Sequence, residues 1–246
     1  MSLLYALLGL LVGAFLNLCA DRLPEHRSIL TYPFCPYCQR ERDPLGWVSV
    51  LAYALLRGRC QHCGAPYPLR APLMELAMAL IFAFLGRRYG LSLRFLFVAL
   101  YACAYILVFV TDLEHRLIPN TVIYPAMLLA LGGSLLGHVV ETKSALIGGA
   151  IGFSFFYVVA LVYPGGMGGG DVKLAGFIGL VTGFPNVISA LVMGIFVGGF
   201  VAFFLLITRL KGLKSSLPYG PFLVVGGLAI LLFGKEIGNW LLAHCF

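Results

Sequence analysis

Long uncharged apolar runs recur along this 246-residue chain and constrain its fold more than any other feature. A helix needs about 17–25 apolar residues to cross the hydrocarbon core of a bilayer. The chain is 61% hydrophobic and 11% charged, so a single water-soluble core cannot bury these runs. The sequence therefore predicts an all-α polytopic membrane protein with about eight transmembrane helices. The runs lie at 3–19, 72–86, 93–111, 121–138, 145–163, 172–183, 186–208 and 218–234.

Two of these runs, 72–86 and 172–183, are short, and the glycine-rich 172–183 would cross fully only with help from its neighbours. The tail 237–246 either extends the last helix or lies in the membrane interface. The first run has no positively charged segment before it and no A-x-A-like cleavage site, so we expect a permanent helix and not a signal peptide.

The distribution of basic residues predicts the orientation, because Lys and Arg are retained on the cytoplasmic side. With the N-terminus outside, most of the 17 Lys and Arg residues fall on inside segments. The net charge of +7 is then mainly a topology signal, with some attraction to anionic membrane lipids, and it does not indicate nucleic acid. Three parts are predicted: a first transmembrane helix (1–19), a cytosolic module (20–71) and a membrane domain (72–246).

Four of the seven cysteines form two C-x2-C pairs in the predicted cytosolic module. Cys35 and Cys38 make one pair, and Cys60 and Cys63 make the other. Two such turns supply four thiolates at the corners of a tetrahedron, the arrangement that structural Zn²⁺ prefers. The alternatives are two disulfides, a redox pair or free thiols, and a cytosolic location disfavours disulfides. A module of this size needs such a staple, because its core is small. We therefore expect a zinc-binding cytosolic insertion.

Few carboxylates lie beside the apolar runs, where ionisable groups are costly and usually functional. Asp112 follows the apolar run 105–111, and Asp171 closes a glycine-dense turn. The two crossings between them return the chain to the same, cytoplasmic face, so we expect the two carboxylates to meet. Taken alone, each aspartate also fits the role of a helix cap at the membrane edge. The glycine-rich loop by itself also fits an ordinary turn. The other two carboxylates in this setting are Glu75 and Glu114.

A facing pair of aspartates is the machinery of an aspartic protease. Close like charges resist being ionised together, so the pair shares one proton. The ionised member takes a proton from water, and the protonated member polarises the scissile carbonyl. Glycines in the turn let a substrate backbone approach closely, and Lys173 could tune the pair or bind lipid phosphate. Gly168, Gly170 and Lys173 are therefore candidate substrate contacts.

The order of the motifs resembles a known family. Asp112-x6-Pro119-Asn120, followed by Gly-Gly-Gly-Asp-Val-Lys-Leu at 168–174, is similar to the paired signature of the GxGD membrane aspartic peptidases. More closely, the chain resembles the bacterial prepilin peptidases, or type IV leader peptidases. The opening segment 13–24, the two cysteine pairs and the segment 67–70 leading to Glu75 follow in the family's order. The resemblance covers nearly the whole chain.

This resemblance implies a function and a set of site residues. Such enzymes remove the short basic leader of type IV prepilins, or of pseudopilins of type II secretion systems, at the cytoplasmic face of the bacterial inner membrane. Many members then methylate the new N-terminus with S-adenosylmethionine. The resemblance assigns catalysis to Asp112 and Asp171. It assigns zinc binding to the four cysteines of the two pairs.

For methyl transfer, Glu75 is the first candidate by position, followed by Asn17 and Arg22. The alternative is a structural role, in which Glu75 pairs with a loop arginine such as Arg70 and Asn17 hydrogen-bonds between helices.

The chain departs from the family at three places. Asn120 stands where many relatives have a second aspartate, Asp21 replaces an apolar or aromatic residue, and Trp47-Val-Ser49 replaces an Asn-Ile-Pro-like element. Most of these changes fall in or beside the cytosolic module, so they affect the expected methylation more than the expected proteolysis.

Two other classes of protein compete with a peptidase. A transporter or proton relay would use Asp112 and Asp171 as titrating groups at mid-membrane depth and would show inverted hydropathy repeats, and none is convincing here. A methyltransferase-type scaffold without proteolysis would hold the two aspartates too far apart to share a water.

Overall fold

A computed structural model describes residues 2–25, 27–28, 34–35, 37–41, 46–163, 167–208 and 218–245. Within these ranges the chain forms nine helices and no strand beyond isolated bridges. It divides into two compact units, Met1–Phe95 and Leu96–Phe246. The first unit contains the predicted first helix and the four-cysteine module together with a third helix.

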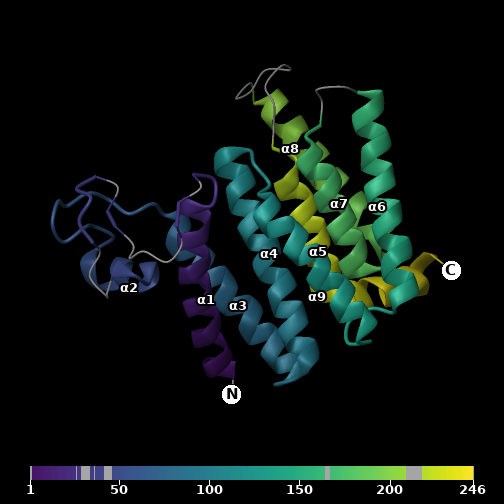
Figure 1. Ribbon diagram of the computed structural model, residues 1–246, viewed down its shortest axis with the longest axis horizontal. Coiled ribbons are helices and arrows are strands. Elements are labelled where there is room, and N and C mark those ends of the chain that lie inside the picture. Colours follow the sequence, from purple (N-terminus) through teal and green to yellow (C-terminus); the bar gives the residue numbers. More distant parts are fainter. Residues whose placement is uncertain are drawn as a thin grey trace. The chain divides into compact units, whose positions relative to one another are not determined.

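In the first unit, α1 (Ser2–Arg22) and α3 (Arg70–Tyr89) lie side by side (Figure 1). The glycines of α1 make this approach possible. A Cβ at Gly9 would lie 2.5 Å from the backbone oxygen of Met78, and a Cβ at Gly13 would lie 2.7 Å from the Cα of Glu75. Small residues let two helices of a membrane protein pack backbone against backbone, and α1 and α3 pack in this way.

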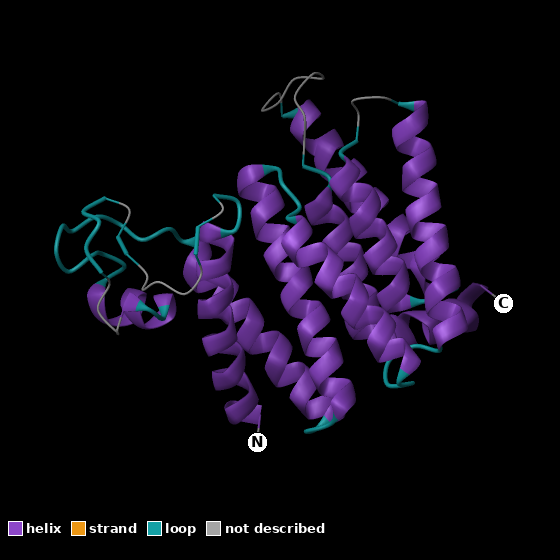
Figure 2. Ribbon diagram, in the orientation of Figure 1, coloured by secondary structure: helices purple, strands orange, loops and turns teal. Residues whose placement is uncertain are grey.

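The described residues between α1 and α3 are mostly loops and turns around one short helix, α2 (Ser49–Leu56) (Figure 2). The sequence did not predict this helix. Val48 at its N-cap makes no side-chain capping bond. The partner of its first backbone N–H groups therefore comes from elsewhere in the unit.

The second unit is built from α4 to α9. Its helix α7 lies among α5, α6, α8 and α9 (Figure 1). Nearly all of the side chains of α7 are buried. The bounds are α4 Leu93–His115, α5 Asn120–Leu135, α6 Thr142–Val162, α7 Gly169–Thr182, α8 Asn186–Ile207 and α9 Gly220–Cys245. The first residues of α4 belong to the first unit.

The packing around α7 explains how a helix of only 14 residues is accommodated. The ring of Phe177 meets Tyr101 and Tyr105 of α4, with centroids 6.3 and 5.0 Å apart. On the other side, a Cβ at Gly179 would lie 2.1 Å from the backbone oxygen of Gly148 in α6. Helix α7 is therefore held by its neighbours, as the short run 172–183 led us to expect.

Four helices in the described part of the chain are long and apolar enough to cross a membrane: α1, α4, α6 and α8. Two shorter apolar helices are Asn120–Leu135 and Gly220–Gly234. Several long apolar helices indicate a multi-pass membrane protein, and the total of eight spans stays a prediction. The tail extends the last helix, since α9 continues to Cys245.

Candidate functional site

The second unit brings Asp112 and Asp171 together from two different helices. Asp112 lies in the last turn of α4 and Asp171 in the first turn of α7. Both are buried, with 5% and 9% of their surface exposed. They are close enough for the charge of Asp112 to act on Asp171. The C-terminal end of α4 and the N-terminal end of α7 thus bring the two carboxylates of the predicted pair near each other.

A glycine backbone lies against each carboxylate. The N–H of Gly168 donates to Oδ2 of Asp171 over 3.2 Å. Gly220, at the start of α9, packs on the other aspartate, and a Cβ on Gly220 would lie 2.6 Å from Oδ2 of Asp112. Oδ2 of Asp112 is buried and has no hydrogen-bond partner within the described ranges. A buried carboxylate oxygen without a partner is costly and points to a reactive or ligand-binding position.

The candidate substrate contacts lie around this pair. The N–H of Gly168 is the donor to Asp171, and a Cβ at Gly170 would lie 3.0 Å from the Cβ of Ile118. Lys173 is already engaged: its Nζ donates to Oδ1 of Asn120 over 2.8 Å and lies 5.2 Å from the ring centroid of Tyr124. Asn120 thus fixes Lys173 at the start of α5.

The four cysteines of the first unit form one cluster, as their spacing predicted. The Sγ atoms of Cys35, Cys38, Cys60 and Cys63 all lie within 4.8 Å of one another. Sγ of Cys35 and Sγ of Cys63 are 3.7 Å apart, and none of the four is in a disulfide. With Zn–S bonds of about 2.3 Å, the edges of a tetrahedral ZnS₄ site are about 3.8 Å long. The cluster therefore fits a metal ion of this coordination.

The two cysteine turns are built alike. Each first cysteine donates its N–H to a carbonyl five residues on, over 2.9 Å, and accepts from an N–H four residues on. The residues that donate this second bond, Gln39 and Gly64, both have positive φ, 56° and 70°. Backbone N–H groups of Cys63 and His62 point at the thiol of Cys60 and lower its pKa to about 6. The second turn is therefore prepared to present a thiolate.

Glu75 lies in α3 and is fully buried. Its Oε1 accepts the N–H of Ser49 over 2.7 Å and its Oε2 accepts the N–H of Val50 over 2.8 Å. These are the first residues of α2, so Glu75 supplies the cap that Val48 lacks. Arg70, the arginine suggested for a structural role of Glu75, pairs with Asp21. The structural partners that the described residues give Glu75 are the backbone donors of α2.

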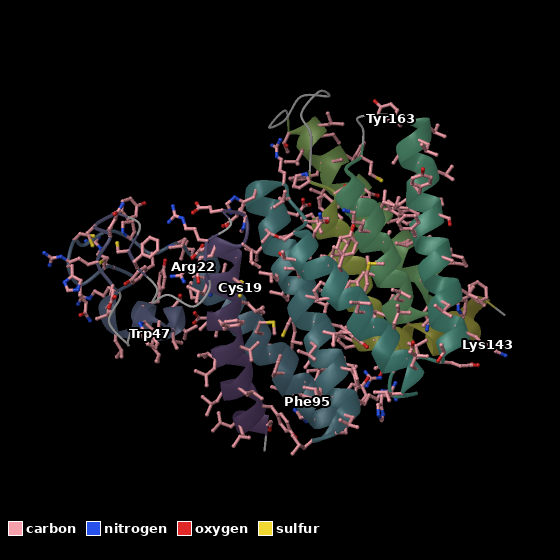
Figure 3. All side chains as sticks on the ribbon, viewed as in Figure 1. Cys19, Arg22, Trp47, Phe95, Lys143 and Tyr163 are labelled. Atoms are coloured by element: carbon pink, nitrogen blue, oxygen red, sulfur yellow. The ribbon has the colours of Figure 1, made fainter. Side chains whose placement is uncertain are left out.

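The other two candidates for methyl transfer also have defined partners. Nδ2 of Asn17 donates to the carbonyl of Ala71 over 2.9 Å and to Oε1 of Glu75 over 3.3 Å, which confirms the expected bond between helices. Arg22 lies beside Cys19 at the carboxyl end of α1 (Figure 3). It is buried, and its Nη1 donates to the carbonyl of Ser28 over 2.8 Å.

Sequence reasoning missed the backbone contacts of both sites. Ser49 and Val50 carry no side-chain signal for holding Glu75, and Gly220 had no assigned role. One signal was available for Gly220: Pro218-Tyr219-Gly220-Pro221 interrupts the chain directly before the last apolar run. Such a break marks the start of a helix, whose first N–H groups need acceptors.

The fold and these sites define a helical membrane protein with a buried aspartate pair in one unit and a four-thiol cluster in the other. Two family models match the chain. The type IV leader peptidase family matches residues 99–203, which contain both aspartates, and the bacterial Peptidase A24 N-terminal domain matches residues 7–89.

Full-length relatives are similar over almost the whole chain. Three are named "Prepilin leader peptidase/N-methyltransferase". The Bacillus subtilis protein is 30% identical, covering 96% of each chain, and the Pseudomonas aeruginosa protein is 28% identical, covering 94% of this chain and 90% of its own. The Aeromonas hydrophila protein is 28% identical over 97% and 92%. The chain belongs to the type IV leader peptidase family. No solved structure matches it significantly.

Proposed function

We propose that this protein is a membrane aspartic endopeptidase that removes the basic leader of type IV prepilins or pseudopilins. The observation that carries the proposal is the buried pair Asp112 and Asp171, each in contact with a glycine backbone and near enough to interact. The family assignment and the names of the relatives support the substrate class.

The chemistry follows from the pair. One aspartate, ionised, takes a proton from water, and the water oxygen attacks the carbonyl carbon of the scissile peptide. The other, protonated, polarises the carbonyl oxygen, and a proton then passes to the leaving amine. No covalent intermediate forms. Gly168, Gly170 and Lys173 are the proposed substrate contacts, because they surround Asp171 at the start of α7.

The proposed location is the bacterial inner membrane, with the pair at its cytoplasmic face. A substrate whose hydrophobic helix lies in the lipid and whose basic leader projects into the cytosol would then reach the aspartates at the membrane edge.

We also propose that the protein methylates the new N-terminus with S-adenosylmethionine, as the names of the relatives indicate. Glu75, Asn17 and Arg22 are the proposed residues for this step. Each of them also makes hydrogen bonds that stabilise the first unit. We therefore propose that they act by holding this unit in the conformation that would bind the methyl donor. Structural Zn²⁺ is the proposed ion of the four-cysteine cluster, since donor type and spacing fit it.

The test uses purified full-length protein in detergent and a synthetic prepilin peptide that carries the leader and the start of the hydrophobic helix. Mass spectrometry follows cleavage. Asp112→Asn and Asp171→Asn should each abolish cleavage while zinc content and thermal unfolding stay close to those of the wild type. Retained cleavage by either variant would exclude the aspartate pair as the catalytic machinery.

A further inference from the structure

We propose that Gly220, the first residue of α9, positions Asp112 for the reaction and forms a third element of the aspartate site. The inference rests on the proposed peptidase function. It assigns a role to a segment far from both aspartates in the sequence, and the role depends on the backbone of Gly220 and on its lack of a side chain.

The contact is a close approach of the Gly220 backbone to the carboxylate of Asp112. A Cβ built on Gly220 would lie 2.6 Å from Oδ2 and 3.1 Å from Cγ of Asp112. Real Cβ atoms do not approach that closely, so any other residue here would push the carboxylate aside.

Asp112 is buried where Gly220 approaches it. It is 5% exposed, and its Oδ2 has no hydrogen-bond partner in the part of the chain that the structure describes. Gly220 lies in the first turn of α9, where the helix dipole favours a negative charge. A side chain at position 220 would therefore move the carboxylate away from this helix start.

The missing side chain lets a buried atom pack directly on the helix backbone. Oδ2 of Asp112 is buried, and a methyl group at Gly220 would stand 2.6 Å from it. Ile118 limits the room on the same side, since its Cδ1 would lie 3.4 Å from the added Cβ.

The first experiment compares the cleavage kinetics of Gly220→Ala with those of two glycine controls, in purified full-length protein with the synthetic prepilin peptide. A misplaced catalytic group lowers the rate by about 100-fold for a shift of about 1 Å. We expect Gly220→Ala to lower kcat by at least about 100-fold, with KM within threefold of the wild type.

The controls separate positioning from general damage. Gly199→Ala adds a methyl group in open space and should leave kcat unchanged. Gly226→Ala lies on the same helix, and its Cβ would meet the backbone oxygen of Ala190 at 2.2 Å. It should lower the thermal midpoint with a much smaller loss of kcat per folded molecule than Gly220→Ala.

The second experiment needs no activity. Thermal unfolding is measured for Gly220→Ala, for Asp112→Ala and for the double variant. If the added methyl group acts on the Asp112 carboxylate, then removing that carboxylate makes room for it, and the double variant should unfold at a higher temperature than Gly220→Ala alone. The proposal is overturned if the double variant recovers no stability, or if Gly220→Ala cleaves with the kcat of the wild type. If the wild type cleaves no prepilin, the proposed peptidase function fails, and the stability comparison still decides whether Gly220 positions Asp112.

Discussion

Glu75 allows a quantitative prediction, because its carboxylate replaces the missing cap of α2. In Glu75→Ala, the N–H groups of Ser49 and Val50 lose acceptors at 2.7 and 2.8 Å. A hydrogen bond to a charged group contributes about 1.5–3 kcal/mol. The two bonds together therefore stabilise the start of α2 by about 3–6 kcal/mol. The bond from Nδ2 of Asn17 is longer, at 3.3 Å, and joins Glu75 to α1, not to α2.

The assay is amide hydrogen–deuterium exchange of full-length, zinc-loaded protein, read on peptides that cover 46–57. Every 1.4 kcal/mol changes an equilibrium about tenfold, so the lower bound of about 3 kcal/mol predicts exchange at least about 100-fold faster in α2. Peptides from α6 and α7 should not change, because their packing lies within the second unit.

Two further variants sharpen the comparison. Glu75→Gln keeps one acceptor oxygen but turns an NH₂ group toward the other N–H, so its exchange should be intermediate. Glu25→Ala removes an exposed carboxylate that pairs with Arg27 and should leave α2 as in the wild type. Exchange in α2 that stays at the wild-type rate in Glu75→Ala would refute the capping argument. If Glu75 supports methylation through α2, methyl transfer should fall in the same order as α2 stability.

Three other predictions follow from single contacts. Cys38→Ser and Cys60→Ser should each reduce bound zinc, measured by elemental analysis, to a small fraction of the wild-type content, and full zinc content in either would remove that thiol from the ligand set. Gly179→Ala should lower the free energy of unfolding of the second unit by about 1–3 kcal/mol, because its Cβ would meet the Gly148 backbone oxygen at 2.1 Å. The measurement is the thermal midpoint, and an unchanged midpoint would contradict the α6–α7 packing. Lys173→Met should raise KM for the prepilin peptide about tenfold with little change in kcat, because one charge-assisted contact to the substrate is lost. An unchanged KM would mean that Lys173 serves only to hold Asn120.

The helices could be predicted well because the signal for them is local. Apolar runs such as 93–111 and 186–208 became helices Leu93–His115 and Asn186–Ile207, within a few residues at each end. A run of apolar side chains in a bilayer has few alternatives to a helix, since every backbone polar group must be paired inside the segment. Helix α2 escaped prediction because its stability depends on a carboxylate from another helix.

The four-cysteine cluster is confirmed as a cluster, and its spacing alone was sufficient. Two residues between cysteines impose a tight turn, and two tight turns with four thiols have one compact way to satisfy a metal ion. The backbone partners of Glu75 could not be predicted, for the opposite reason. Its carboxylate accepts the N–H groups of Ser49 and Val50, and every residue except proline offers such a donor.

The amino-acid sequence by itself determined that this is a membrane protein, where its long apolar helices run, which cysteines cluster and which two aspartates interrupt the apolar runs. These properties depend on side-chain chemistry and short spacing, which a sequence displays directly. Only the tertiary structure decided what surrounds those groups: that Gly220 lies against Asp112 and that Glu75 caps α2. Those contacts join side chains to backbone groups from distant segments. A backbone group is nearly the same at every residue, so its partner is known only once the chain has folded.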